Sequence, residues 1–223
     1  MLKCLVILIF LNCFVLAQGS DFEFESNSKS QYQNVFNYSS LWISRTVPFR
    51  PYDKMRILIS LGYSLPTKFF QGQPWILPDA DIAVKISNNL ILSGKVYGFS
   101  TKKNQIQVIG SGLQYLFGGQ RIKEFVFNIQ RVDLNVHEKF RLKSITYESS
   151  RWISKKLSFI RFGLGINFFS VDYNDFQEKN NFEGQNNYLF IDLLRPFYGF
   201  FGGFGLKIHH ERSLLSFFIQ KEF

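Results

Sequence analysis

The chain ends in the stretch SLLSFFIQKEF, residues 213–223, and this stretch decides between the folds that the sequence allows. In an extended strand every second side chain lies on the same face. One face here carries four apolar residues, Leu215, Phe217, Ile219 and Phe223. A soluble domain usually ends in a few loose polar residues. A chain that ends on an aromatic residue of an apolar strand face therefore needs an apolar environment for that face.

The same alternation recurs throughout residues 55–223, between clusters of turn-type residues. It predicts an all-β chain of about ten strands, with eight or twelve also compatible, at 55–65, 81–87, 90–100, 106–117, 122–134, 140–149, 157–173, 188–194, 198–208 and 213–223. The alternation shifts phase near Arg131, where we expect a β-bulge. No helix is predicted after residue 17.

Two kinds of antiparallel barrel fit this pattern. In a soluble barrel, such as a lipocalin-like carrier of an apolar ligand, the apolar faces point inward, whereas in a membrane barrel they point outward to lipid. The apolar faces are rich in large aromatic residues, and the opposite faces are rich in Gly, Ser and Asn, as in 157–173. Small residues suit the crowded interior of a narrow barrel. We therefore favour an antiparallel up-and-down transmembrane β-barrel over residues 55–223, with the soluble carrier as the alternative.

The N-terminal part of the chain divides into two segments. Residues 1–17 combine Lys3, an apolar stretch and small residues before a cleavage site, which is typical of a secretory signal peptide. Both cysteines, Cys4 and Cys13, lie within it, so we expect the mature chain to contain none. Residues 18–54 are polar and irregular, with one candidate short strand at 41–47. Whether they plug the barrel or stay disordered is open at this point.

The composition excludes some classes of partner. The 223 residues carry a formal net charge of +9, but Lys and Arg are scattered singly, so a nucleic-acid-binding arm is not expected. The Gly-rich stretch YGFFGGFG, residues 198–205, lacks the spacing of a phosphate-binding loop. We expect no cofactor and no metal.

The closing strand resembles that of small bacterial outer-membrane β-barrel proteins, which end on an aromatic residue preceded by alternating apolar ones. The resemblance implies that the barrel lies in the outer membrane, in contact with its lipid. It also implies that Leu215, Phe217, Ile219 and Phe223 form an assembly signal read by the barrel-assembly machinery, and that the last strand pairs with the first. Lys221 departs from the pattern, since that position is usually aromatic or apolar.

Two long connections, 66–80 and 174–187, are expected on the same end of the barrel, where outer-membrane barrels carry their extracellular loops. These loops are the candidate contact with a protein partner. A barrel of eight to ten strands is filled mostly by side chains, so a wide pore is not expected. The predicted role is structural or in interaction, or else narrow transport.

Five charged residues are candidates for the lumen, because they lie opposite the apolar strand faces: Arg56, Lys85, Arg161, Lys207 and Asp192. A lumen with an excess of cations would favour anions. The alternative is that these residues pair with acids or lie near the rims of the barrel.

A weak enzymatic hypothesis concerns the stretch HHERS. It contains His209, His210, Glu211 and Ser213, the residue types of an acyl-hydrolase triad. Neighbours on one turn rarely point at a common centre, so we favour a solvated polar loop and predict no enzymatic activity. The two adjacent histidines lack an evident third metal ligand.

Overall fold

The computed structural model describes residues 29–51, 55–67, 75–101, 104–119, 124–155, 158–175 and 178–223. The predicted signal peptide, residues 1–17, lies outside these ranges. No helix within the described ranges is long and apolar enough to cross a membrane.

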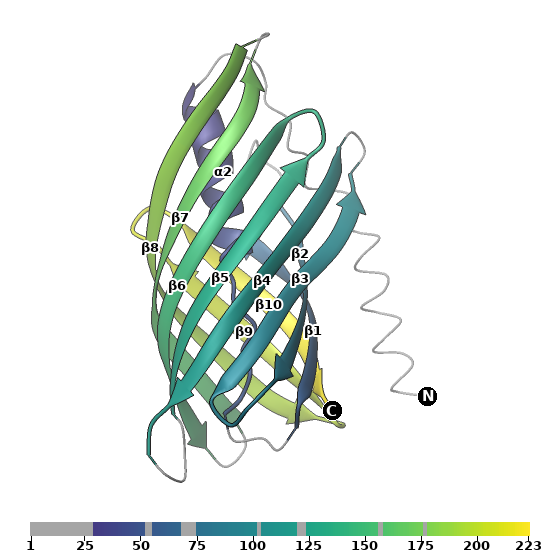
Figure 1. Cartoon of the computed structure of the whole chain (residues 1–223), viewed down its shortest axis with the longest axis vertical. Helices are drawn as coiled ribbons and strands as arrows, with labels where there is room; N and C mark the ends of the chain where they lie inside the picture. The colour runs from purple at the N-terminus through teal and green to yellow at the C-terminus, as the bar shows by residue number, and fades with distance from the viewer. Residues whose placement is uncertain are drawn as a thin grey trace.

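The ten predicted strands are confirmed, and they form a closed antiparallel barrel in which each strand pairs with its neighbours in the chain (Figure 1). Their bounds are β1 Ile57–Pro66, β2 Leu77–Lys85, β3 Leu90–Ser100, β4 Gln105–Phe117, β5 Phe125–Val136, β6 Phe140–Lys155, β7 Ser158–Asp175, β8 Glu178–Phe197, β9 Phe200–Ile208 and β10 Ser213–Glu222. We call the end with the C-terminus the lower end and the opposite end the upper end, as drawn in Figure 1.

The last strand closes the barrel. Strand β10 pairs with β9 on one side and with β1 on the other, where Leu61 lies opposite Ile219 and Tyr63 opposite Phe217. Every strand therefore has two hydrogen-bonded neighbours, although the upper part of β8, Glu178–Tyr188, pairs with β7 alone.

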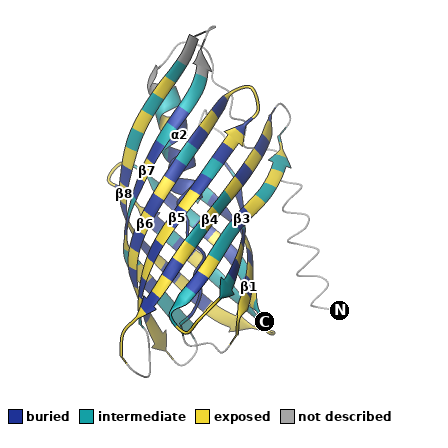
Figure 2. Ribbon diagram, viewed as in Figure 1, coloured by how far each residue is buried: buried dark blue, intermediate teal, exposed yellow. Residues whose placement is uncertain are grey.

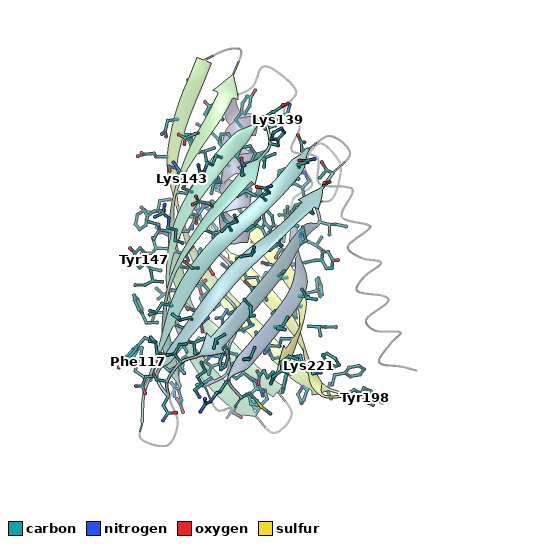
Figure 3. The ribbon with its side chains drawn as sticks, turned by 45° about the vertical axis from the view of Figure 1, so that its right-hand side comes forward. Phe117, Lys139, Lys143, Tyr147, Tyr198 and Lys221 are labelled. Atoms are coloured by element: carbon teal, nitrogen blue, oxygen red, sulfur yellow. The ribbon has the colours of Figure 1, made fainter. Side chains whose placement is uncertain are left out.

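The lower part of the barrel is apolar on the outside. Large outward-facing side chains alternate with buried ones along nearly every strand, as the exposed and buried bands of Figure 2 show. Aromatic residues gather toward the lower end, where Phe117 stacks between Tyr115 and Phe125 at centroid distances of 6.3 and 5.6 Å. Figure 3 places Phe117 and Tyr198 at this end. An apolar belt with aromatic residues near its border is the outer surface of a membrane-spanning barrel.

The polarity of the barrel wall reverses toward the upper end of β4 to β8. On β5, the outward residues change from Phe127 and Ile129 to Arg131 and Asp133, while the inward residues become apolar. Figure 3 shows the same order on β6 and its upper turn, with Lys139 and Lys143 above Tyr147. We call the outward polar residues of this region the upper wall: Gln107, Arg131, Asp133, Asn135, Arg141, Lys143, Asp172, Glu183 and Gln185.

The β-bulge expected near Arg131 is therefore wrong. Strand β5 stays in continuous register with β4 and β6, and its side chains alternate in and out without interruption. The hydrophobic pattern shifts because the surroundings change: below Arg131 the outer face meets an apolar medium, whereas above it the outer face is polar and the inner face packs on an apolar core.

The expectation of no helix after residue 17 is also wrong. Helix α2, Lys29–Ile43, lies inside the upper part of the barrel (Figure 1), and the following residues descend through the lumen. The candidate strand at 41–47 is thus the end of a helix and an irregular segment. The helix is rich in Ser, Asn and Tyr, which are mediocre helix formers, so its stability comes from packing inside the barrel.

The predicted loop 174–187 is mostly strand. Strands β7 and β8 continue to Asp175 and from Glu178, and their register is unbroken from Phe159–Leu194 upward. The polar composition that suggested a loop, such as Asn181, Glu183 and Gln185, is the outer face of the upper wall. In the predicted loop 66–80, β2 already begins at Leu77.

Candidate functional site

The lumen is filled by residues 29–51, which we call the plug. Its upper layer is apolar: Phe36 and Trp42 are almost completely buried, and they pack among inward residues of the upper strands, including Val108, Val132, Leu134, Leu142 and Val171. Aromatic contacts hold the first turns of α2, because Tyr32 stacks on Tyr173 at 5.6 Å and Phe36 meets the edge of Phe140 at 5.2 Å. The upper mouth is thus packed like the core of a soluble protein.

A charged layer lies below the helix. Arg45 of the plug lies 3.3 Å from Asp79 and 3.4 Å from Asp81, both on β2. Lys95 on β3 binds the same two carboxylates at 2.7 and 2.6 Å. The ring of Phe218 on β10 lies 4.4 Å from the Arg45 guanidinium carbon. All four charges are buried, and a buried charge is tolerated only when it is paired.

A second charged cluster lies on the β6 to β9 side of the same layer. Glu148 is buried, accepts hydrogen bonds from Thr46 Oγ1 of the plug and from Tyr188 Oη, and lies 3.4 Å from Lys207 Nζ. Lys207 also donates to Ser44 Oγ of the plug at 2.9 Å.

Arg161 on β7 joins the wall to the main chain of the plug. It forms an ion pair with Asp192 at 2.6 Å and donates to the carbonyl oxygen of Thr46 at 3.1 Å. Neutral side chains act in the same way, since Gln114 donates to Val47 O and Gln130 donates to Ile43 O, both at 2.9 Å. An extended segment without a strand partner thereby has its main-chain acceptors satisfied by the barrel wall.

The lower mouth is closed by a further apolar layer and one ion pair. Val47 and Phe49 of the plug pack with buried residues from around the barrel, including Leu58, Ile91, Leu116, Trp152 and Leu194. Arg50 makes a two-pronged contact with the Glu222 carboxylate at 3.0 and 2.6 Å, and its guanidinium lies 3.5 Å from the centre of the Phe201 ring.

Only three of the five predicted lumen residues lie inside the lumen. Arg161, Lys207 and Asp192 lie in the charged layer, whereas Arg56 is exposed just before β1 and Lys85 is half-buried at the lower end of β2. The prediction missed five members of the layer: Arg45, Asp79, Asp81, Lys95 and Glu148. Four cations (Arg45, Lys95, Arg161, Lys207) face four carboxylates (Asp79, Asp81, Glu148, Asp192), so this layer has no excess of cations. The expected positive lumen is not found there.

The residues of the HHERS stretch lie in the upper turn between β9 and β10 and at the start of β10. His209 Nε2 lies 3.1 Å from His210 Nδ1, and His210 lies 3.5 Å from Glu211. Burial, together with the neighbouring His210 and Arg212, lowers the pKa of His209. No hydrogen bond joins Ser213 Oγ to either histidine, so the contact that would activate a nucleophile is missing. Within the described ranges, no three His, Cys, Asp or Glu side chains gather as a metal site would require.

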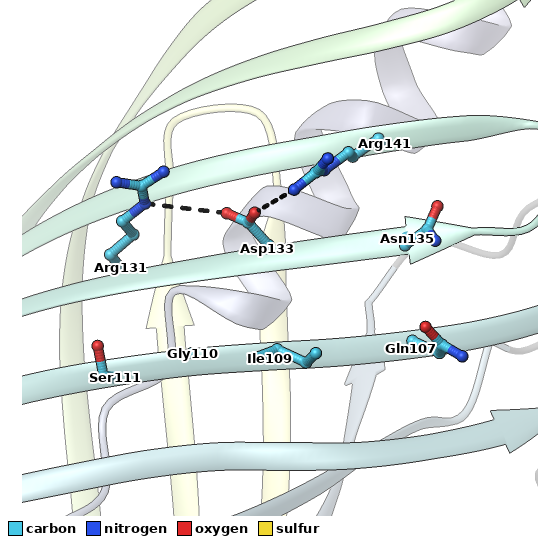
Figure 4. A pocket seen from close by; sticks show the side chains of 8 residues that line it. All are labelled: Gln107, Ile109, Gly110, Ser111, Arg131, Asp133, Asn135 and Arg141. Carbon is cyan, nitrogen blue, oxygen red and sulfur yellow. Dashed lines mark hydrogen bonds and ion pairs between the residues drawn. The ribbon is translucent and has the colours of Figure 1, made fainter.

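A groove of about 570 Å³ lies on the outside of the barrel, between the upper parts of β4 and β5 (Figure 4). Asp133 stands at its centre and lies 2.9 Å from Arg141 and 3.9 Å from Arg131. The groove is lined mostly by polar residues, and its apolar residue Ile109 lies opposite Asp133, between Ser111 and Gln107 along β4.

No protein-family model matches this sequence, and no curated protein matches it. Among solved structures, the chain is similar to the translocator domain of the autotransporter NalP from Neisseria meningitidis, with a TM-score of 0.45 and 8% identity over 86% of this chain and 95% of that one. It is also similar to the KdgM porin in complex with disordered oligogalacturonate (TM-score 0.39, 8% identity, 74% and 99% covered) and to Ail, the attachment invasion locus protein of Yersinia pestis (0.33, 12%, 75% and 95%). Each likeness concerns the fold alone.

The class of protein follows from the barrel itself. A closed barrel satisfies its backbone hydrogen bonds internally, which a membrane-spanning sheet requires, and its lower outer face is an apolar belt. The chain is therefore a ten-stranded outer-membrane β-barrel protein. The soluble-carrier alternative is wrong, because it requires the apolar strand faces to point inward and in this barrel they point outward.

Proposed function

We propose that this protein is a closed outer-membrane barrel with a structural or interaction role, in which residues 29–51 seal the lumen. The observation that carries the proposal is the charged layer, in which Arg45, Thr46 and Ser44 of the plug contact charged groups on the wall from β2 to β9. A pore that conducts ions needs a continuous water path. Here apolar layers lie both above and below the charged layer.

The partners of such a barrel follow from its surfaces. The apolar belt fits outer-membrane lipid, and the closing strand β10 is the element that the barrel-assembly machinery would read. The upper wall, polar and raised above the belt, is the surface we propose for a protein partner, in place of the loop predicted at 174–187.

Conductance in planar lipid bilayers tests the proposal. We expect the mature chain to be silent, and a variant lacking residues 18–51 to conduct. A matched variant lacking only residues 18–28 keeps the whole plug and should stay silent. Heat-modifiable mobility in gel electrophoresis identifies the preparations that have folded. Steady conductance by the folded mature chain would contradict the closed state.

Narrow transport is the second candidate, and it requires the plug to leave. Without Arg45, the wall of the charged layer carries three cations against four carboxylates, a net charge of −1. The plug-free barrel should then prefer cations to anions. The reversal potential in a salt gradient, measured on the variant lacking residues 18–51, gives this preference directly.

A further inference from the structure

The plug runs through the barrel in a single direction. Tyr32 and Phe36, near its start, contact upper-strand residues such as Tyr173, and Arg45 lies in the charged layer. At its end, Arg50 pairs with Glu222 beside the C-terminus. The chain therefore enters the lumen at the upper mouth and leaves it at the lower mouth, where β1 begins.

Two observations identify the upper end as the extracellular one. The upper wall extends the barrel beyond its apolar belt on one end only, with charged and amide side chains facing outward. The longest connection between strands, residues 67–76, is also at the upper end. Outer-membrane barrels carry short turns on the periplasmic side and longer extensions on the extracellular side.

The first turns of α2 reach the rim of the upper mouth. Asn34 is exposed, and its side-chain oxygen accepts a hydrogen bond at 3.3 Å from Arg212, in the upper turn between β9 and β10. Tyr32 and Gln33 beside it are half-buried, and Val35 and Phe36 are buried. The helix is thus in contact with water at Asn34, near the upper mouth.

We propose that the barrel holds its own N-terminal segment across the outer membrane, so that the mature chain ahead of helix α2 is displayed at the cell surface. The sealed lumen makes this arrangement stable. A return of the segment to the periplasm would remove Arg45 from the buried carboxylates of Asp79 and Asp81, which would then share the single cation Lys95, and a buried charge left without its partner is strongly unfavourable. The displayed segment would add a short interaction element to the polar upper wall. This inference rests on the proposed plug.

Single cysteines test the topology, because the mature chain is expected to contain none of its own. Asn34→Cys reports on the start of the helix. Lys139→Cys in an upper turn and Ser87→Cys in a lower turn are the matched controls, since both side chains are exposed. Intact cells are treated with a membrane-impermeant maleimide, before and after permeabilisation of the outer membrane.

We expect Asn34→Cys and Lys139→Cys to react fully in intact cells, and Ser87→Cys to react at least tenfold more after permeabilisation. Reaction of Asn34→Cys only after permeabilisation would overturn the proposal, as would a reversed pattern in the two controls. An epitope inserted after Ser20 gives a second measurement, and an antibody should detect it on intact cells. Detection only in permeabilised cells would also overturn the proposal. If the mature chain does not conduct in planar bilayers but Asn34→Cys is not labelled on intact cells, the barrel is closed and the proposed surface display of its N-terminal segment is wrong.

Discussion

The main chains of Phe223 and Ile57 are joined by two hydrogen bonds. Phe223 N donates to Ile57 O at 2.8 Å, and Ile57 N donates to Phe223 O at 3.1 Å. Phe223 O also accepts from Arg56 N at 2.8 Å. The last residue of the chain is thus the last rung of the ladder between β10 and β1, and its ring faces outward at the lower border of the belt. Lys221 Nζ lies 4.7 Å from the centre of that ring, which explains a cation in an otherwise apolar series.

Deletion of Phe223 should therefore impair closure of the barrel. It removes three main-chain hydrogen bonds at the seam, and the fraction of chain that reaches the heat-modifiable, folded form should fall several-fold. The variant Phe223→Leu keeps the main-chain bonds and an apolar side chain, so it should fold nearly as well as the natural sequence. Equal folding yields for the deletion and the natural sequence would show that closure does not depend on this rung.

The reversal of polarity along β5 predicts opposite responses to the same substitution on the same strand face. Ile129 lies in the apolar belt and Asn135 in the upper wall, both facing outward. Ile129→Arg should lower the free energy of unfolding in lipid vesicles by about 2–4 kcal/mol if it lies near the bilayer midplane, whereas Asn135→Arg should change it by about 0–1 kcal/mol. Equal costs at the two positions would mean that the belt does not end near Arg131.

The alternation of apolar and polar residues was sufficient to predict the ten strands, because lipid imposes it on every strand of the belt. Ile160, Phe162 and Leu164 face outward on β7 as expected. The same argument fails above the belt, where the outer face is polar and the inner face packs on α2. In the sequence this boundary takes the form of a phase shift near Arg131 and of a predicted loop at 174–187.

The plug could not be predicted from such a pattern. Its buried residues, Val35, Phe36, Trp42 and Ile43, recur at helical spacing, but they stand among Ser, Asn and Gln, because the helix contacts a mixed apolar and polar wall. The charged layer is equally hidden in the sequence. Lys95 and Glu148 are single charges in separate strands, and only the folded barrel brings them to Arg45, Ser44 and Thr46.

Two adjacent glycines on β9 offer a matched test of packing against the plug. A Cβ atom at Gly203 would lie 2.2 Å from the ring of Phe218, the ring that contacts Arg45. A Cβ atom at Gly202 would have nothing within 4 Å. Gly203→Ala should therefore lower the unfolding temperature, because overpacking typically costs about 1–3 kcal/mol, while Gly202→Ala should not. The double variant Gly203→Ala/Phe218→Leu should recover part of the loss. A similar loss at both glycines would point to the strand backbone and not to the Phe218 ring.

The pair Glu148 and Lys207 tests whether the charged layer acts as a unit. Glu148→Gln leaves the Lys207 ammonium buried without its carboxylate, and breaking one side of a buried pair costs about 3–5 kcal/mol. Lys207→Met should also destabilise the barrel, since Glu148 then loses its cation. The double variant should cost less than the sum of the two, with a coupling energy of about 0.5–3 kcal/mol, as expected for residues in one network. Urea unfolding in detergent micelles measures all four members of the cycle.

The partly exposed pair Lys143 and Asp172, 3.3 Å apart on the upper wall, is the matched control, and Lys143→Met should cost about 0–1 kcal/mol. Strict additivity of Glu148→Gln and Lys207→Met would contradict the coupling, and the charges that hold the plug would then act independently of one another.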